Sequence, residues 1–205
     1  MDWTDEKNIL LNEEEEESTP LQKWCRRDFL KSFLCAGAAL LLPAEALARV
    51  AGPTASRERV LTLYSPNTGE FLKEVTFWQN GHYYGPGLRA INHFCRDTHN
   101  NTVHAIDPAL LDKLYLINQC LPGAHPQNII LSGYRSPSTN ARLRRHNRRV
   151  ARQSYHMEGK ALDIRVKGVS VAHVRNVALR LHQGGVGYYP RSGFVHIDTG
   201  PLRTW

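Results

Sequence analysis

Two histidines and an aspartate in the second half of the chain have the types and spacing of a metal site. Residues 154–163, SYHMEGKALD, contain His156 and Asp163, and residues 194–198, FVHID, contain His196. Zinc binds histidine nitrogen and aspartate oxygen at about 2.0–2.2 Å, and a catalytic zinc keeps three protein ligands so that water takes the fourth position. We therefore expect His156, Asp163 and His196 to hold one Zn²⁺.

Strands must bring these residues together, because they lie far apart along the chain. Gly159 interrupts any helix between His156 and Asp163, so we expect His156 in a loop that runs into a strand carrying Asp163. If the strand of His196 is its neighbour, the three side chains converge on one side of a sheet. The chain contains ten histidines, so one near an aspartate can also arise by chance.

The elements around these residues alternate between strand-like and helical patterns. Turn residues in 65–69 and at Asn80-Gly81 separate the first strands. The expected strands are Val60–Tyr64, Glu70–Trp78, Asn128–Ser132, Ala161–Val166, Gly184–Tyr189 and Gly193–Thr199. The sequence thus predicts an α+β fold: a single domain with a small antiparallel sheet that carries the zinc ligands and is flanked by helices.

Three segments are predicted to be helical. Asp107-Pro108 and Ser170 have the residue types of helix starts, and Ser138 to about Gln153 reads as an arginine-rich helix. That basic segment could attract carboxylates of a substrate, or it could be a solvated face. The helix after Asp107 is expected to bury a face made of Leu111, Leu114, Tyr115, Asn118 and Leu121.

The charge of the chain is unevenly distributed. Residues 1–48 carry five Lys/Arg and ten Asp/Glu, whereas residues 49–205 carry 21 Lys/Arg and nine Asp/Glu. A basic body suits a polyanionic partner such as an acidic wall polymer, anionic lipid or nucleic acid, or it is a basic surface without a charged target. No nucleic-acid motif accompanies the arginines, so we expect no nucleic-acid partner.

The N-terminal segment resembles a twin-arginine export signal. Arg26-Arg27 is followed by the apolar run 33–42 and by Ala46-Leu-Ala48, and the run is shorter than the roughly 20 residues that span a bilayer. We expect residues 1–48 to be an acidic extension plus signal peptide, 49–59 a linker and 60–205 the functional domain. The alternatives are an uncleaved signal anchor and an amphipathic helix of a cytosolic protein.

Export has two consequences for the mature protein. It would work in the periplasm, without stable membrane insertion once the signal is cleaved. Of the four cysteines, Cys95 and Cys120 would remain, and an oxidising compartment permits a disulfide between them. Two buried free thiols are the alternative, because the sequence does not show whether their Cα atoms lie close enough to bond.

Several short motifs in order resemble the zinc D-Ala-D-Ala metallopeptidases, a family of murein endopeptidases, D,D-carboxypeptidases and dipeptidases. The resemblance spans residues 60–205 and is closest to an exported subgroup. Its motifs are SGYRSP at 132–137, SxHxxGxAxD at 154–163, GVGYYP at 185–190 and FVHIDTGPLRTW at 194–205. The resemblance implies that His156, Asp163 and His196 are the zinc ligands.

The resemblance also implies roles for residues beside the metal. Arg135 matches an arginine that family members direct at the substrate carbonyl or the developing oxyanion, although a surface salt bridge is the alternative. The general base is open, because Gly193 and Phe194 stand where relatives carry a glutamate or a histidine. Asp198 is the candidate base, since residues 196 and 198 share a strand face.

Two other roles are open for Asp198: it could orient His196 from behind, or it could itself bind the metal. Glu158, next to His156, is a weaker candidate for the base. The function implied by the resemblance is hydrolysis of peptide cross-links or stem peptides of peptidoglycan by zinc-activated water. The alternative is an inactive peptidoglycan-binding module that retains the fold.

Overall fold

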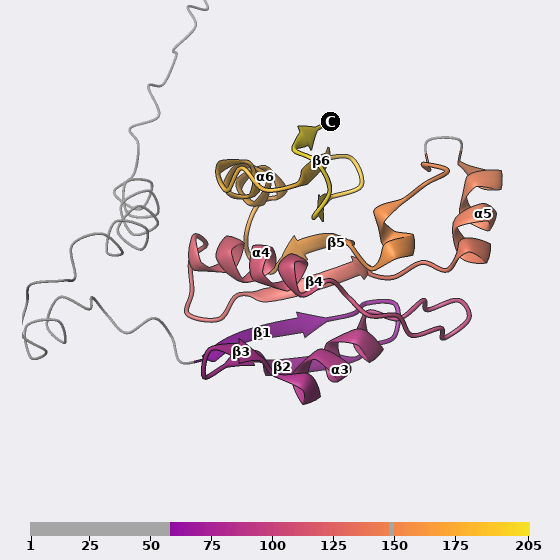
Figure 1. Cartoon of the computed structure of the whole chain (residues 1–205). Helices are drawn as coiled ribbons and strands as arrows, with labels where there is room; N and C mark the ends of the chain where they lie inside the picture. Colours follow the sequence, from indigo (N-terminus) through magenta and orange to yellow (C-terminus); the bar gives the residue numbers. More distant parts are fainter. Residues whose placement is uncertain (1–57, 148–149) are drawn as a thin grey trace, which may run out of the picture. The chain divides into compact units, whose positions relative to one another are not determined.

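The computed structural model describes residues 58–147 and 150–205, which fold around one eight-stranded mixed sheet (Figure 1). The strand order is β3-β2-β1-β4-β5-β7-β6-β8. The strands are β1 (Glu58–Tyr64), β2 (Phe71–Gln79), β3 (His82–Tyr83), β4 (Gln127–Ser132), β5 (Ala161–Val166), β6 (Gly185–Tyr189), β7 (Phe194–Asp198) and β8 (Arg203–Thr204).

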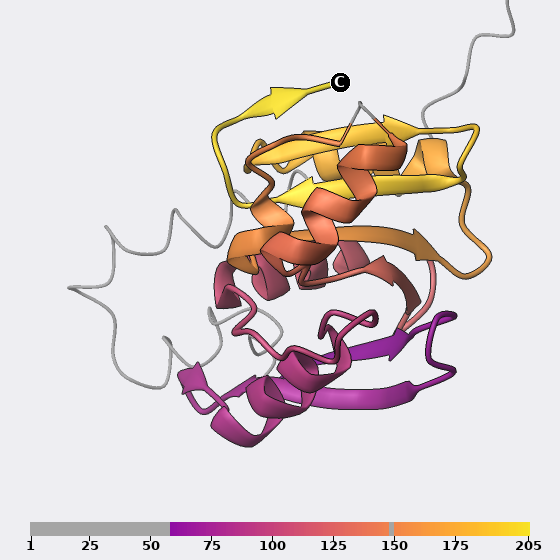
Figure 2. The same ribbon diagram turned by 90° about the vertical axis from the view of Figure 1, so that its right-hand side faces the viewer.

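Most neighbouring strands in this sheet are antiparallel, as predicted. The exceptions are the parallel pairs β1 with β4 and β6 with β8. Figure 2 shows β6 and β7, in yellow, alongside the orange β5. The sheet is larger than the small one expected, because β3 and β8 are short strands without the alternating pattern that reveals a longer one.

Four α-helices of the described residues accompany the sheet, and three of them begin at side-chain caps. The Asp107 carboxylate accepts a hydrogen bond from the Ala109 N–H, and the hydroxyls of Ser136 and Ser170 cap the two later helices in the same way. The helices are α3 (Gly85–Phe94), α4 (Pro108–Gln119), α5 (Pro137–His146) and α6 (Val171–Arg180), with a 3₁₀ turn η1 (Tyr155–Glu158).

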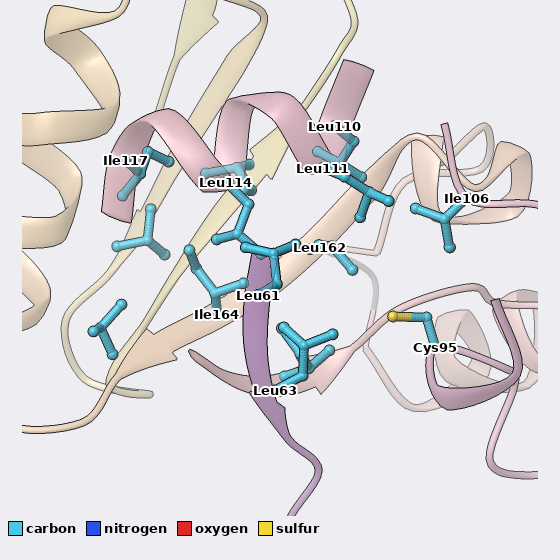
Figure 3. Close-up of a cluster of buried hydrophobic side chains, with 14 of the residues drawn as sticks. Leu61, Leu63, Cys95, Ile106, Leu110, Leu111, Leu114, Ile117, Leu162 and Ile164 are labelled. Carbon is cyan, nitrogen blue, oxygen red and sulfur yellow. The ribbon is translucent and has the colours of Figure 1, made fainter. Parts of the chain in front are cut away.

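The main core lies between α4 and the central strands (Figure 3). Leucines of α4 face Leu61 of β1 and Leu162 of β5, and all of these side chains are buried. Buried apolar surface contributes roughly 25 cal/mol per Å², so this contact helps to hold β5, the strand that carries Asp163. Lys113, also on α4, is buried as well, and its ammonium donates to the carbonyl oxygens of Gly185 and Asp198.

Several helical predictions differ from the structure. Helix α5 ends at His146, not near Gln153, and α3 was not anticipated because its Gly-Pro-Gly start is typical of a turn. Of the face expected on α4, Tyr115 is only half-buried. None of the described helices is long and apolar enough to cross a membrane.

Two further predictions concern the N-terminal segment and the cysteines. The expected signal peptide at 1–48, with its paired arginines, lies outside them, as does most of the expected linker, although β1 already begins at Glu58. Cys95 is a free and buried thiol, so no Cys95–Cys120 disulfide exists. Burial raises the pKa of the Cys95 thiol to about 12.

Candidate metal centre

The three predicted ligands converge at one point of the sheet. Asp163 on β5 lies directly opposite His196 on β7, and His156 approaches the same point from η1. Oδ1 of Asp163 is 2.9 Å from Nδ1 of His196 and 3.3 Å from Nε2 of His156. The two histidine nitrogens are 3.2 Å apart, and all three side chains are buried.

The spacing of these atoms fits coordination to a single zinc ion. Two ligands at about 2.0–2.1 Å from a tetrahedral zinc lie about 3.3–3.4 Å apart. The three observed separations are 2.9, 3.2 and 3.3 Å. The donor set, two imidazole nitrogens and one carboxylate oxygen, is also one that zinc binds, so the residues fit the metal that the family implies.

Hydrogen bonds on the far side of each ring decide which histidine nitrogen faces this point with a lone pair. Nδ1 of His156 lies 2.7 Å from the carbonyl oxygen of Gly133, which only accepts, so the neutral ring keeps its lone pair on Nε2. Nε2 of His196 lies 3.1 Å from the Asp198 carboxylate, which leaves the lone pair on Nδ1. Two lone pairs and a carboxylate oxygen then face one another with no hydrogen to share, an arrangement that a cation stabilises.

The charges in the site support an ionised Asp163 and a neutral His156, but they favour the protonated form of His196. Burial raises the pKa of Asp163, but the neighbouring His156, His196 and Arg135 outweigh it and hold the pKa below its usual value. Burial lowers the pKa of His156. Burial also lowers that of His196, but hydrogen bonds to Asp163 and Asp198 outweigh it and raise the pKa. A proton and a metal ion would therefore compete for the space between His196 and Asp163.

A single 3₁₀ turn places His156. The Ser154 hydroxyl accepts a hydrogen bond from the His156 N–H at the start of η1, and Gly159 ends the turn with a φ of 67°. A β-carbon at Gly159 would strike the carbonyl oxygen of Ala105. Both the left-handed backbone and this close approach require glycine at position 159.

Asp198 is fully buried behind His196, on the side away from Nδ1, the nitrogen that faces Asp163. Its carboxylate accepts hydrogen bonds from His196, from the N–H groups of Gly185 and Gly200, and from Arg203. Burial raises its pKa, but these hydrogen bonds outweigh burial and lower the pKa to about 2. Among the roles left open for Asp198, this geometry favours orientation of His196 over proton transfer at the metal.

Arg135 lies beside Asp163 at the edge of a cavity. Its Nη2 donates to Oδ2 of Asp163 at 2.6 Å, and its Nε donates to the Ser132 hydroxyl at 2.8 Å. The cavity has a volume of about 540 Å³, and Arg135, Asp163 and Phe194 are among its lining residues. The guanidinium is therefore held in one orientation next to the cluster, where it can stabilise negative charge on a bound substrate.

Other residues near the cluster have roles that the sequence did not reveal. Glu158 is exposed on η1 and accepts a hydrogen bond from Lys160. Gly133 and Ser132 act through contacts with His156 and Arg135, and they lie inside the SGYRSP motif. Their motif was visible, but only the fold shows which atom each one contacts.

Comparison with known proteins assigns the chain to a family. The chain matches the family described as peptidoglycan L,D-endopeptidase MepK over residues 53–205. It is 46% identical over 167 residues to peptidoglycan L,D-endopeptidase MepK of Escherichia coli (strain K12), covering 82% of this chain and 89% of that protein. It is 43% identical over 166 residues to the probable peptidoglycan L,D-endopeptidase MepK of Haemophilus influenzae, covering 80% and 87%. No solved structure matches the chain. The chain therefore belongs to the MepK family of peptidases, related to the zinc D-Ala-D-Ala metallopeptidases that its motifs resemble.

Proposed function

We propose that this chain is a zinc-dependent peptidase that hydrolyses peptide cross-links of peptidoglycan. The observation that carries the proposal is the convergence of two histidine lone pairs and one ionised carboxylate oxygen, because a hydrolytic zinc needs such a donor set and an open position. The relatives from Escherichia coli and Haemophilus influenzae are named as peptidoglycan L,D-endopeptidases. We therefore infer an internal L,D bond as the target, in preference to removal of a terminal D-Ala.

His156, Asp163 and His196 would hold the metal. When bound, zinc polarises the scissile carbonyl and makes a water molecule more acidic. The protein's own contribution is to hold the three ligand atoms in position before substrate arrives, with the His156 ring fixed by Gly133 and the His196 ring fixed by Asp198.

Arg135 is the residue proposed to stabilise the transition state. Its bonds to Ser132 and Asp163 hold the guanidinium at the cavity before substrate binds. A charge fixed in this way needs no reorganisation when the carbonyl oxygen becomes negative. Asp198 acts through His196 as a positioning residue, because its buried carboxylate lies on the far side of that ring.

The proposed site of action is the periplasm, after export by the twin-arginine signal in residues 1–48. The functional domain would occupy residues 60–205 after a linker at 49–59. Peptidoglycan peptides carry free carboxylates, and the exposed arginines of α5 would attract them: Arg142, Arg144 and Arg145. We expect peptidoglycan as the partner and no nucleic acid.

The test is digestion of purified sacculi by the full chain, with and without a chelator, followed by mass spectrometry of the released muropeptides. The proposal predicts fragments cut at an L,D bond, which disappear with chelator and return when zinc is added. Binding to sacculi without release of any fragment would instead indicate the inactive wall-binding module.

A further inference from the structure

An aromatic residue outside the metal cluster is fixed beside it by the sheet. The segment after Leu202 pairs with β6: the Trp205 N–H donates to the carbonyl oxygen of Val186 at 3.3 Å, and the Tyr188 N–H donates to that of Trp205 at 2.9 Å. The backbone of Trp205 is therefore part of the sheet. The position of its side chain follows from strand pairing, as the position of His196 does.

The missing side chain of Gly187 makes room for the Trp205 indole. Gly187 on β6 lies directly opposite His196 on β7, so both residues belong to the same face of the sheet. A β-carbon at Gly187 would lie 2.7–2.9 Å from three atoms of the indole. The indole thus occupies the space next to His196, with the two ring centroids 5.3 Å apart.

The indole belongs to an aromatic wall that consists of Trp205, Tyr189 and Phe194. Nε1 of Trp205 donates to the Tyr189 hydroxyl at 2.7 Å, and the Tyr189 ring stacks on Phe194 at 4.5 Å. Phe194 lines the cavity that also borders Asp163 and Arg135. The wall therefore continues from the metal cluster into the cavity.

Trp205 is nevertheless 49% exposed and Tyr189 37% exposed. A tryptophan is usually buried over most of its surface, and an ordered aromatic surface left open to solvent is typical of a binding site. The arginine next to it, Arg203, lies 5.0 Å from the indole centroid and bonds the Asp198 carboxylate. Arg203 thus contacts both the exposed indole and the carboxylate that orients His196.

We propose that Trp205 is a substrate-contacting residue of this site, and that its indole packs against an aliphatic side chain next to the scissile bond. This inference deepens the proposed function and rests on it. The scissile bond must lie at the metal. The indole centroid is 5.3 Å from that of His196, a proposed metal ligand. The group on the indole therefore belongs to a residue that flanks the bond, not to the glycan strand.

The experiment compares the full-length wild type with Trp205→Ala and Trp205→Phe, and uses Leu202→Ala as the control. Leu202 is 64% exposed and close in sequence, so its variant removes apolar surface outside the wall. We expect Trp205→Ala to raise KM about tenfold with little change in kcat. The variant removes the indole, and the exposed half of that ring system is the surface proposed to contact substrate. Trp205→Phe keeps an aromatic ring and is expected to retain most of the affinity.

A second readout separates contact with substrate from support of the metal site. Zinc content is expected to be the same in all variants. Cosedimentation with sacculi in chelator, where no hydrolysis occurs, is expected to be weaker for Trp205→Ala than for Leu202→Ala. Should Trp205→Ala fold poorly, Tyr189→Phe tests the same wall by removing the hydroxyl that holds the indole, with an expected rise in KM of about threefold.

An unchanged KM in both Trp205→Ala and Tyr189→Phe would overturn the inference, as would loss of zinc from Trp205→Ala. A zinc-loaded wild type that releases no muropeptide overturns the peptidase proposal instead. The two failures are therefore distinguishable.

Discussion

Asp163 and His196 form a directly opposed pair on the antiparallel strands β5 and β7, with Oδ1 and Nδ1 2.9 Å apart. Strand register alone thus places two of the three proposed ligand atoms at a separation that fits a shared metal ion. A shift of either strand by one residue would turn its ligand to the opposite face of the sheet. The position of Asp163 against His196 therefore depends on the pairing of these two strands, and only His156 depends on a turn.

Loss of one ligand is expected to abolish metal binding. His156→Ala removes one of the three proposed protein ligands. Loss of a residue that only hydrogen-bonds a ligand typically lowers metal affinity about 10–100-fold, and we expect a larger fall here. Metal content after dialysis against trace zinc measures this. The control is His173→Ala, because His173 is exposed on α6. Stoichiometric zinc in the His156 variant would rule out the proposed site.

Asp198 is expected to act on zinc through the tautomer of His196. In Asp198→Asn, an amide that donates to Nε2 would favour the hydrogen on Nδ1, the nitrogen that faces Asp163. We expect zinc affinity to fall about 10–100-fold, as for other outer contacts of a metal site. Competition with a chromophoric chelator measures the affinity.

The matched control for that variant is Asp112→Asn. Asp112 also pairs with an arginine, Arg59, but on the β1 side of the sheet. Its zinc affinity should equal that of the wild type. If Asp198→Asn binds zinc as tightly as Asp112→Asn, Asp198 does not position His196.

The convergence of His156, Asp163 and His196 was predictable from the sequence because most of the information behind it is local. The alternating pattern of Ala161–Val166 and the FVHID stretch identified two strands, and the residue types at 156, 163 and 196 identified three side chains that the fold brings together. The break between His156 and the strand of Asp163 followed from Gly159. Each of these features depends on neighbouring residues only, apart from the pairing of the two strands.

Features that depend on distant contacts were not predictable in this way. The sequence did not predict that Lys113 is buried, because its partners Gly185 and Asp198 lie 72 and 85 residues away. The alternation that made residues 196 and 198 share a face was correct. It could not show that His196 turns its Nε2 toward Asp198. This contact is the one that favours a positioning role for Asp198.

Arg135 is expected to matter for the chemical step. Arg135→Lys retains the charge but cannot donate to both Ser132 and Asp163 in the planar geometry of a guanidinium. Loss of such a fixed donor typically lowers kcat about 10²–10³-fold. We expect this loss with normal zinc content, measured by muropeptide release. Full activity in Arg135→Lys would reduce Arg135 to a structural ion pair.

Lys113 is expected to make stability depend on pH in the alkaline range. Burial lowers its pKa to about 8, although the charge of Asp198 raises it. The unfolded chain then holds this proton up to about pH 10.5, whereas the folded protein loses it from about pH 8. Because the unfolded state binds more protons in this window, the free energy of unfolding contributed by Lys113 rises with pH.

Chemical denaturation at pH 7.5 and 9.5 measures this effect against Lys113→Met. The variant loses two hydrogen bonds to carbonyl groups and is less stable at both values, so only the change with pH is compared. Between the two pH values, the unfolding free energy of the wild type should increase by about 2 kcal/mol more than that of the variant. Other titrating groups contribute equally to both proteins and cancel. Equal changes would mean that Lys113 titrates in the fold as it does in the unfolded chain, and that its ammonium is solvated despite its burial.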